Sequence, residues 1–179
     1  MTSRSVPVVR AATAADAPLL SRLGGETFRE TYAGQMRDQD IAEYVGATDN
    51  SGRQARELAD PTFGYLVLDD GGEAAGFALV RAGHDCPAVR GNDVAELVRF
   101  YVRGPWQGSG LGRTLMKSVL AEARRLGGRR IWLSVWEHNA RAIAFYERMG
   151  FRVAGTRFFQ LGADRQNDYV MVLHLQEQP

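Results

Sequence analysis

Residues 107–113 combine glycines, a serine and an arginine in a pattern that can bind phosphate. They read QGSGLGR and lie between the strand-like run ELVRFYV and the helix-like run LGRTLMKSVLAEARRLGG. The first N–H groups of a helix together carry roughly half a positive charge, and glycines let a ligand approach the backbone. A helix start without a ligand usually gathers Asp or Glu, but the first acid in this helix is Glu122 and its first turn holds Arg113. The segment therefore predicts a site for a diphosphate rather than a bare turn.

Two common nucleotide-binding loops do not fit this segment. A P-loop needs a Gly-Lys-Ser/Thr triplet, which residues 107–113 lack. The spacing of Gly108, Gly110 and Gly112 also differs from the G-x-G-x-x-G of a dinucleotide fold, and no acidic residue ends a strand about 20 residues later. We therefore expect the diphosphate to belong to a different kind of ligand.

The composition of the chain is that of one ordinary globular domain, residues 1–179, with 45% hydrophobic and 24% charged residues. A net charge of +1 lacks the concentrated positive field that nucleic acids and membrane surfaces attract, so we expect neither as a partner. No stretch approaches the ~20 apolar residues of a membrane span, and the N-terminus lacks a signal-peptide core. We expect a cytoplasmic protein.

Cysteine and histidine give no sign of a metal site or of thiol chemistry. Cys86, the one cysteine, lies in the loop-like segment HDCPAVRGND, and no histidine or helix start is placed to activate it. We expect a free surface thiol in a reducing compartment. His84, His138 and His174 lack metal-ligand spacing, so we expect no metal and take each histidine as structural or exposed.

The N-terminal part of the sequence predicts one strand followed by helices. VPVVRAAT alternates like a strand, and the next helix begins at Thr13 or Asp16. A glycine costs about 1 kcal/mol relative to alanine inside a helix, so we expect Gly24 and Gly25 to bend or break this helix. A second short helix is expected to end near Val45, and SGRQARELAD predicts a third that stops at the following proline.

The rest of the sequence predicts strands with two inserted helices. FGYLVLDDGGEAAGFALV predicts a hairpin around an Asp-Gly turn, and AELVRFYV predicts the strand that leads to the glycine loop. The helix after the loop stops at Gly127 and Gly128, and RIWLSVW has the continuous apolar pattern of a central strand. A helix capped by Asn139 ends at Gly150, and FRVAGTRFFQ pairs with QNDYVMVLHL. We expect one α/β or α+β domain.

Two segments together resemble the GNAT acetyltransferases. Gln107-Gly108-Ser109-Gly110-Leu111-Gly112 matches the Q/R-x-x-G-x-G/A pyrophosphate loop of that superfamily. WLSVWEHNARAIAFYERMGF is similar to the second half of the same fold, where an Asn precedes a helix that contains Tyr and ends in Gly-Phe. The resemblance runs over about residues 6–175. The segments ETFRETYAGQMRDQDIAEYV and GTRFFQLGADRQNDYVMVL look most like the PaiA-type spermidine/spermine N-acetyltransferases.

The resemblance implies an α/β (α+β) GNAT fold and acetyl-CoA as the cofactor. This fold has a central mixed, mostly antiparallel seven-stranded sheet flanked by helices, with a V-shaped split between strands 4 and 5. Backbone groups of one strand edge would hold the pantetheine arm, the glycine loop the diphosphate, and the next helix the far wall. The implied cofactor residues are Phe100, Tyr101 and Val102; Gln107, Gly108, Ser109, Gly110, Leu111, Gly112 and Arg113; and Asn139, Ala142 and Phe145.

The resemblance also implies two groups that move protons. An alkyl amine with a pKa near ~10.4 is protonated at pH 7, so acetyl transfer requires a base. Glu96 is our candidate, acting directly or through water, because it opens the strand that runs to the acetyl site; an ion pair with an arginine is its alternative role. Tyr146 would be a core residue by periodicity alone, and the resemblance makes it the acid that protonates the leaving thiolate. Backbone N–H groups near Tyr101 or Val102 would stabilise the oxyanion.

The segment from Glu26 to Glu43 is the candidate acceptor site. Its acids outnumber its arginines, which suits a polycation and equally suits a solvated helix surface. Phe28 and Tyr32, with Glu26 and Glu30, would contact an aliphatic amine. The function implied is acetylation of a primary amine of a small molecule, a polyamine first. The alternatives are a peptide or protein amine acetyltransferase and a non-catalytic acetyl-CoA-binding module. The resemblance also implies a possible homodimer through the C-terminal strands.

Overall fold

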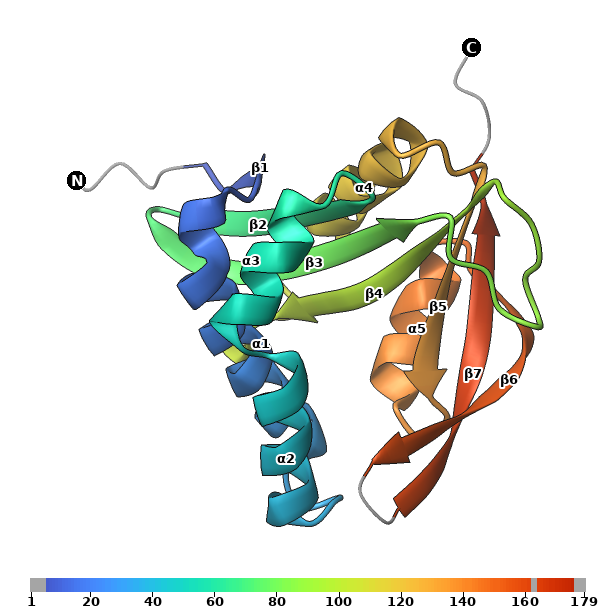
Figure 1. Cartoon of the computed structure of the whole chain (residues 1–179), viewed down its shortest axis with the longest axis horizontal. Helices are drawn as coiled ribbons and strands as arrows, with labels where there is room; N and C mark the ends of the chain where they lie inside the picture. The colour runs from blue at the N-terminus through green and yellow to red at the C-terminus, as the bar shows by residue number, and fades with distance from the viewer. Residues whose placement is uncertain (1–5, 162–163, 176–179) are drawn as a thin grey trace.

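The chain folds into a seven-stranded sheet with helices on both faces (Figure 1). The computed structural model describes residues 6–161 and 164–175. The strands are β1 (Val8–Ala11), β2 (Phe63–Asp70), β3 (Glu73–Ala82), β4 (Val94–Val102), β5 (Arg130–Trp136), β6 (Arg152–Leu161) and β7 (Asp164–His174). The α-helices are α1 (Ala17–Tyr32), α2 (Asp38–Thr48), α3 (Ser51–Ala59), α4 (Leu111–Arg125) and α5 (Ala140–Arg148), and Ala14–Asp16 and Gly104–Trp106 form 3-10 turns.

The sheet opens between its two central strands. The strand order is β1-β2-β3-β4-β5-β7-β6, and every neighbouring pair is antiparallel except β4 and β5. These two strands pair only at their starts, where Val94–Glu96 lies beside Arg130–Trp132. Farther along, β4 is paired with β3, and β5 is paired with β7. The V-shaped split that the resemblance implies is therefore present, and the predicted fold class is confirmed.

Period-two alternation gives the sheet two apolar faces, each covered by a different helix. Leu66 and Leu68 of β2 belong to the cluster that includes α4, whereas Tyr65 and Val67 pack with Leu20 and Leu23 of α1. The helices α1 and α4 therefore lie on opposite faces of the sheet. Among the described residues, no helix is long and apolar enough to span a membrane.

Of the predicted bend or break at Gly24 and Gly25, the break is wrong, because α1 runs continuously through both glycines. A side chain at Gly24 would overlap the buried carboxylate of Asp49, and one at Gly25 would lie 3.0 Å from Val45 Cγ1. The two glycines thus let α1 pack closely against α2 and the α2–α3 corner. This tertiary contact outweighs the low helix propensity of glycine.

The predicted surface thiol of Cys86 is also wrong, because this residue is only 7% exposed. Backbone hydrogen bonds join Cys86 and Val89 in both directions and fold the loop after β3 into a tight bridge. The bridge presents Cys86 to Val94, Trp132 and Val170 on one face of the sheet. A small apolar side chain fits this position, and the thiol packs as part of the core.

The capping and turn predictions are confirmed. The Asn50 side chain accepts a hydrogen bond of 2.9 Å from the Arg53 N–H at the start of α3. Gly127 ends α4 with a φ of +85°. The hairpin of β2 and β3 turns at two glycines, and β6 pairs with β7 as expected.

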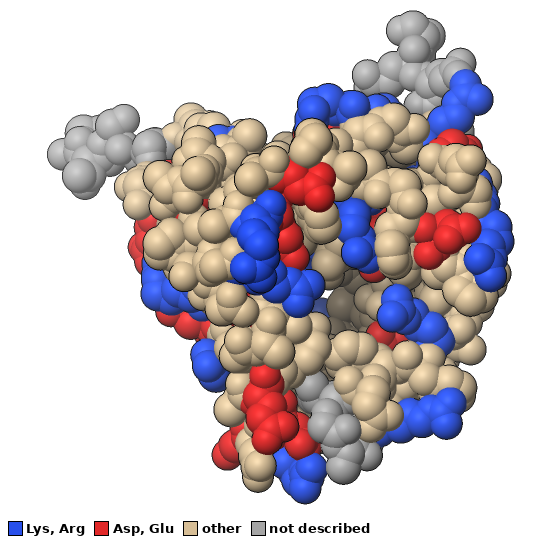
Figure 2. Space-filling view, viewed as in Figure 1, with Lys and Arg blue, Asp and Glu red and all other residues tan. Residues whose placement is uncertain are grey.

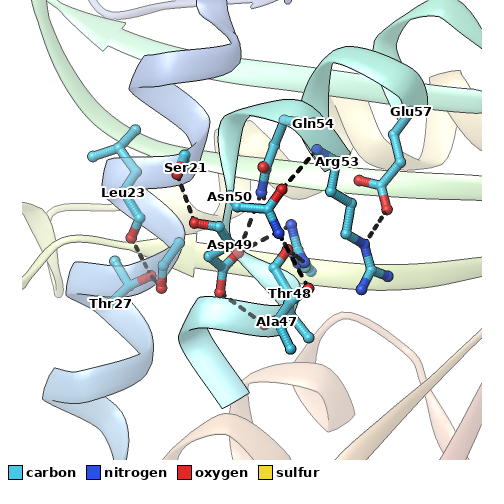
Figure 3. Close-up of polar contacts among 12 residues, drawn as sticks. Ser21, Leu23, Thr27, Ala47, Thr48, Asp49, Asn50, Arg53, Gln54 and Glu57 are labelled. Carbon is cyan, nitrogen blue, oxygen red and sulfur yellow. Dashed lines mark hydrogen bonds and ion pairs between the residues drawn. The ribbon is translucent and has the colours of Figure 1, made fainter. Parts of the chain in front are cut away.

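Polar contacts join α1, the corner between α2 and α3, and α3 (Figure 3), and a buried arginine of β4 binds the same corner. Arg99 of β4, only 9% exposed, lies 3.1 Å from the Asp49 carboxylate and donates to the Thr48 carbonyl at 2.8 Å. Its other hydrogen bond, of 3.2 Å, goes to the Tyr65 hydroxyl, which in turn donates to Glu57. Removing one member of such a network leaves a buried charge without its partner, so the network holds the helices in a fixed position over β4.

A pair of Gly→Ala variants tests the role of Gly24. Gly24→Ala should displace the Asp49 carboxylate and lower the free energy of unfolding by about 1–3 kcal/mol. Gly46→Ala in α2 is the matched control, because nothing lies within 4 Å of its added Cβ, and it should stabilise the protein by about 0.5–1 kcal/mol. Urea unfolding of both variants measures the difference. Equal stabilisation by the two variants would contradict the close contact of α1 with Asp49.

Candidate active site

A cleft of about 1010 Å³ follows the split in the sheet. One wall consists of the second half of β4 and the glycine loop, and the other of the second half of β5 and the start of α5. The end of α1 and Tyr44 of α2 line the cleft on the face of the sheet that lies opposite α4. Figure 2 shows the surface hollowed where these halves of the molecule meet. The cleft therefore has lining residues on both faces of the sheet.

The glycine loop presents bare backbone to one end of this cleft. Gly108 and Gly110 have φ values of +80° and +90°, and nothing lies within 4 Å of a Cβ added at either position. Gln107 donates to the Val102 carbonyl at 2.7 Å, and Ser109 donates to the Trp106 carbonyl, so both side chains are bound by the preceding chain. Gly110 provides no side-chain cap for α4, and the first turn of α4 has no acid. The free N–H groups at this helix start fit an anion.

The facing wall carries positive charge and an aromatic side chain. Asn139 caps α5 by accepting from the Ala142 N–H at 3.1 Å, which confirms its predicted place. Phe145 stacks on Phe100 of β4 with ring centroids 5.5 Å apart, across the narrow part of the split. Arginines from both helices line this end of the cleft and suit the phosphates of a ligand; they are Arg113, Arg141 and Arg148.

Most of the predicted cofactor residues line this one cleft. The exceptions among them are Ser109 and Leu111, which do not line it; Leu111 packs against the core instead. Beyond Glu96, the edge of β4 that faces the split has no strand partner among the described residues. Its N–H and C=O groups require partners, and an extended ligand can supply them as an added strand would.

Tyr146 reaches the cleft from α5 and is 9% exposed. Its ring contacts Phe100, Phe145 and Phe151, with centroids 5.6–6.2 Å away. Burial raises the pKa of its hydroxyl above the ordinary value, so the group keeps its proton at neutral pH. That is the protonation state that a general acid needs.

Glu96 does not line the cleft, in contrast to the expectation for a base. It is 8% exposed and lies at the closed end of the split, where β4 still pairs with Trp132 of β5. Arg81 Nε donates to its carboxylate at 3.1 Å, and His84 Nδ1 lies 3.0 Å away. This arrangement matches the alternative role, an ion pair with an arginine.

Aromatic side chains form the opposite half of the cleft. Phe28 stacks on Tyr44 at 4.4 Å, Tyr32 lies 5.9 Å from Trp136, and Tyr44 lies 5.5 Å from Phe159, measured between ring centroids. Of the four predicted acceptor residues, Phe28, Tyr32 and Glu30 line the cleft. Glu26 does not, and lies beside Arg22 and Arg103 instead.

Asp168 is a site residue that the sequence reasoning missed. It lies on β7 opposite Trp136 of β5, is 7% exposed, and lines the cleft. Burial raises the pKa of its carboxyl, and a hydrogen bond with Ser134 opposes that shift. One signal was available: Asp168 shares one strand face with Val170 and Val172, so an acid directly precedes an apolar pair on that face.

Known proteins resemble the chain in both sequence and fold. Residues 26–151 match the model of the acetyltransferase (GNAT) family. The chain belongs to this family. An uncharacterized N-acetyltransferase of Mycobacterium tuberculosis is 38% identical over 160 residues, which cover 89% of this chain and 98% of the relative. The PaiA N-acetyltransferase of Thermoplasma acidophilum, solved with coenzyme A, superposes with a TM-score of 0.78 at 20% identity, covering 95% of this chain and 99% of that one.

A third GNAT relative has a named substrate. The spermine/spermidine N(1)-acetyltransferase of Bacillus subtilis is 33% identical over 85 residues, which cover 47% of this chain and 56% of the relative. The GNAT chain described here is thus an N-acetyltransferase, and its cofactor is acetyl-CoA. The open glycine loop, the uncapped start of α4 and the lining arginines fit the diphosphate of this cofactor.

Two substitutions at Gly110 test the phosphate site. Gly110→Glu places a negative charge at the start of α4 and should weaken coenzyme A binding by at least about 100-fold, because it opposes the diphosphate. Gly110→Ala, the control, imposes a similar left-handed backbone cost without the charge and should have a much smaller effect. Calorimetric titration with coenzyme A measures both affinities. Equal affinities of the two variants for coenzyme A would show that the glycine loop does not bind the diphosphate.

Proposed function

We propose that this GNAT enzyme acetylates a primary amine of a small molecule, and that polyamines are its first candidate substrates. The observation that carries the proposal is the acceptor half of the cleft, where aromatic rings and carboxylates occur together. An ammonium group is attracted to both, while aromatic walls pack against an aliphatic chain. Glu30 and Asp168 supply the carboxylates, and Phe28, Tyr32 and Trp136 supply the rings.

The surface beside this half of the cleft is also acidic. Acidic side chains gather over α2 in Figure 2, and Glu30, Asp38 and Glu43 are exposed. Asp40 is buried in an ion pair with Arg37, so it is not part of this exposed group. A polyamine carries further ammonium groups along its chain, and these acids could neutralise them. The named substrates of the Bacillus subtilis relative support the same class of acceptor.

The described residues can perform the steps that acetyl transfer needs. Bound acetyl-CoA supplies a thioester whose carbonyl carbon accepts the amine and whose thiolate leaves. Tyr146, protonated at neutral pH, donates a proton to the leaving sulfur. Backbone N–H groups near Tyr101 or Val102, on the free edge of β4, stabilise the oxyanion.

A peptide or protein amine is the second candidate acceptor. The open cleft of about 1010 Å³ has room for an extended chain. A non-catalytic acetyl-CoA-binding module is the third candidate, but a protonated Tyr146 inside the cleft favours catalysis over binding alone.

A substrate panel distinguishes these candidates. Release of the coenzyme A thiol from acetyl-CoA should be fastest with spermidine, spermine or putrescine, compared with amino acids, aminoglycosides and short peptides. Turnover of peptides alone would overturn the polyamine assignment. Coenzyme binding without turnover of any amine would favour the non-catalytic module.

A tyrosine variant tests the general acid. Tyr146→Phe should lower kcat by about 10²–10⁴-fold and leave acetyl-CoA affinity nearly unchanged, because the ring contacts remain while the proton donor is lost. Tyr169→Phe is the control, because Tyr169 packs against the core and does not line the cleft. Steady-state kinetics with the best amine of the panel measure both variants. An unchanged kcat in Tyr146→Phe would remove this residue from the mechanism.

A further inference from the structure

We propose that Asp168 is the catalytic residue that binds the acceptor ammonium and takes its proton, with Ser134 as its positioning residue. The inference rests on the proposed function, since it assumes an amine acceptor. It gives Asp168 the role that the sequence suggested for Glu96. Four observations support it: the strand face that Asp168 occupies, its burial, its charged neighbours and the partners that Glu96 already has.

Asp168 lies on the face of the sheet from which the acceptor would approach. In β5, Trp132, Ser134 and Trp136 alternate onto one face, and Leu133 and Val135 onto the face that packs with α4 and α5. Asp168 pairs with Trp136 and forms its hydrogen bond with Ser134, so it shares the face away from α5. The cofactor loop, at the start of α4, belongs to the other face. The two ligands would thus meet from opposite sides of the split.

Tyr32 connects the acceptor half of the cleft with the Asp168 carboxylate. Its ring centroid lies 5.9 Å from that of Trp136, the strand neighbour of Asp168. Burial and the nearby charge of Asp168 both raise the pKa of the Tyr32 hydroxyl, so this neighbour is neutral at working pH. For an ammonium between these rings, the two acids that line the cleft are the buried Asp168 and the exposed Glu30.

The cation nearest to Asp168 along the sheet, Arg157, favours the charged carboxylate without forming an ion pair with it. Arg157 of β6 pairs with it across the sheet, but its guanidinium lies over the Trp132 ring, 5.9 Å from the centroid. Glu137 lies just beyond β5 and adds negative charge. Within residues 6–161 and 164–175, no cation lies within ion-pair distance of the Asp168 carboxylate. A buried carboxylate without a cation is unfavourable, and an incoming ammonium would supply the missing charge.

Glu96 is already neutralised in the same fold. Arg81 binds its carboxylate, and His84 adds a second nitrogen at 3.0 Å. A carboxylate held in this way has little remaining attraction for an ammonium group, and Glu96 lies outside the cleft. These contacts give Glu96, at the closed end of the split, a structural role. Asp168, on β7, is free to act on a substrate.

In the proposed reaction, Asp168 accepts one proton and Tyr146 donates one. The ammonium R–NH₃⁺ gives its first proton to the Asp168 carboxylate and becomes R–NH₂, which then has a lone pair for attack. During acetylation the C–N bond forms, the C–S bond breaks, and the nitrogen loses a second proton. The departing sulfur takes one proton from Tyr146, and the second proton from nitrogen restores the tyrosine. Asp168 releases its proton to solvent, so one H⁺ is produced for each amide.

Asp168→Asn tests the proposal through the pH dependence of the rate. At pH 7 only a small fraction of an amine with a pKa near ~10.4 is neutral. Because the variant has no carboxylate to take the proton of the ammonium form, its kcat/KM should be at least about 100-fold lower than that of wild type. The deficit should shrink by about tenfold per pH unit between pH 7 and 9, as free amine accumulates. A fluorinated amine that is already neutral at pH 7 should react with the variant nearly as fast as with wild type. Equal losses on both amines would overturn the proposal.

Three further variants separate chemistry from structure. Ser134→Ala removes the hydrogen bond that favours the charged carboxylate, so the acid limb of kcat/KM should move to higher pH. Glu137→Gln, next to the site but outside the cleft, removes a negative charge that raises the pKa of the Asp168 carboxyl, so the acid limb should move in the opposite direction, to lower pH. If Glu96→Gln lost the ammonium-dependent rate and Asp168→Asn kept it, the base would be Glu96.

Melting and binding measurements provide readouts besides turnover. Because burial raises the Asp168 pKa, the folded state binds more protons than the unfolded state between the two pKa values, and stability falls as pH rises through that window. Asp168→Asn should therefore raise the Tm at pH 8, whereas a purely structural role would lower it. Calorimetry with spermidine in the presence of coenzyme A should show at least tenfold weaker binding to the variant, with coenzyme A affinity unchanged. If wild type acetylated no amine, the proposed function would fail, and unchanged spermidine binding would separately overturn the role of Asp168.

Discussion

The separation of β4 from β5 after three paired residues is the constraint on which the site depends. Each strand is held on its outer side: β4 by β3 and by the Arg99–Asp49 pair, and β5 by β7 along its whole length. Their inner edges are left without strand partners, although backbone N–H and C=O groups require them. The resulting gap passes between the two faces of the sheet. In the proposed arrangement, this gap lets a coenzyme held at the start of α4 meet an acceptor that enters beside α1 and α2.

The buried charged side chains of this fold differ in their partners, and we assign them structural or chemical roles on that basis. Arg99 and Asp49 neutralise each other, as do Arg81 and Glu96, and both pairs fix elements relative to one another. Asp168 is equally buried, but its hydrogen-bond partner is the hydroxyl of Ser134. In the role proposed for Asp168, such a carboxylate lowers stability and is neutralised by a cationic substrate. The same comparison, carboxylate by carboxylate, distinguishes Glu96 from Asp168.

Features that depend on neighbouring residues could be predicted from the sequence, and features that depend on distant contacts could not. The glycine loop, the Asn139 cap and the hairpin turns follow from local backbone needs, and each lies where it was expected. Gly24 and Cys86 were misjudged because their environments come from Asp49 and from Trp132, which are far away in the sequence. Asp168 joins the site only because β7 inserts between β5 and β6, and local patterning does not reveal that order of strands.

The central claim is that coenzyme and amine enter the split from opposite faces and meet between Tyr146 and Asp168. A crystal structure with a bisubstrate analogue, in which the acetyl carbon of coenzyme A is bonded to spermidine, tests it most directly. We expect the diphosphate on the N–H groups at the start of α4, the linking carbon between β4 and β5, and the polyamine chain beside Tyr32 with an amine nitrogen at the Asp168 carboxylate. A polyamine chain that leaves on the α4–α5 face, or a diphosphate away from residues 107–113, would contradict the claim.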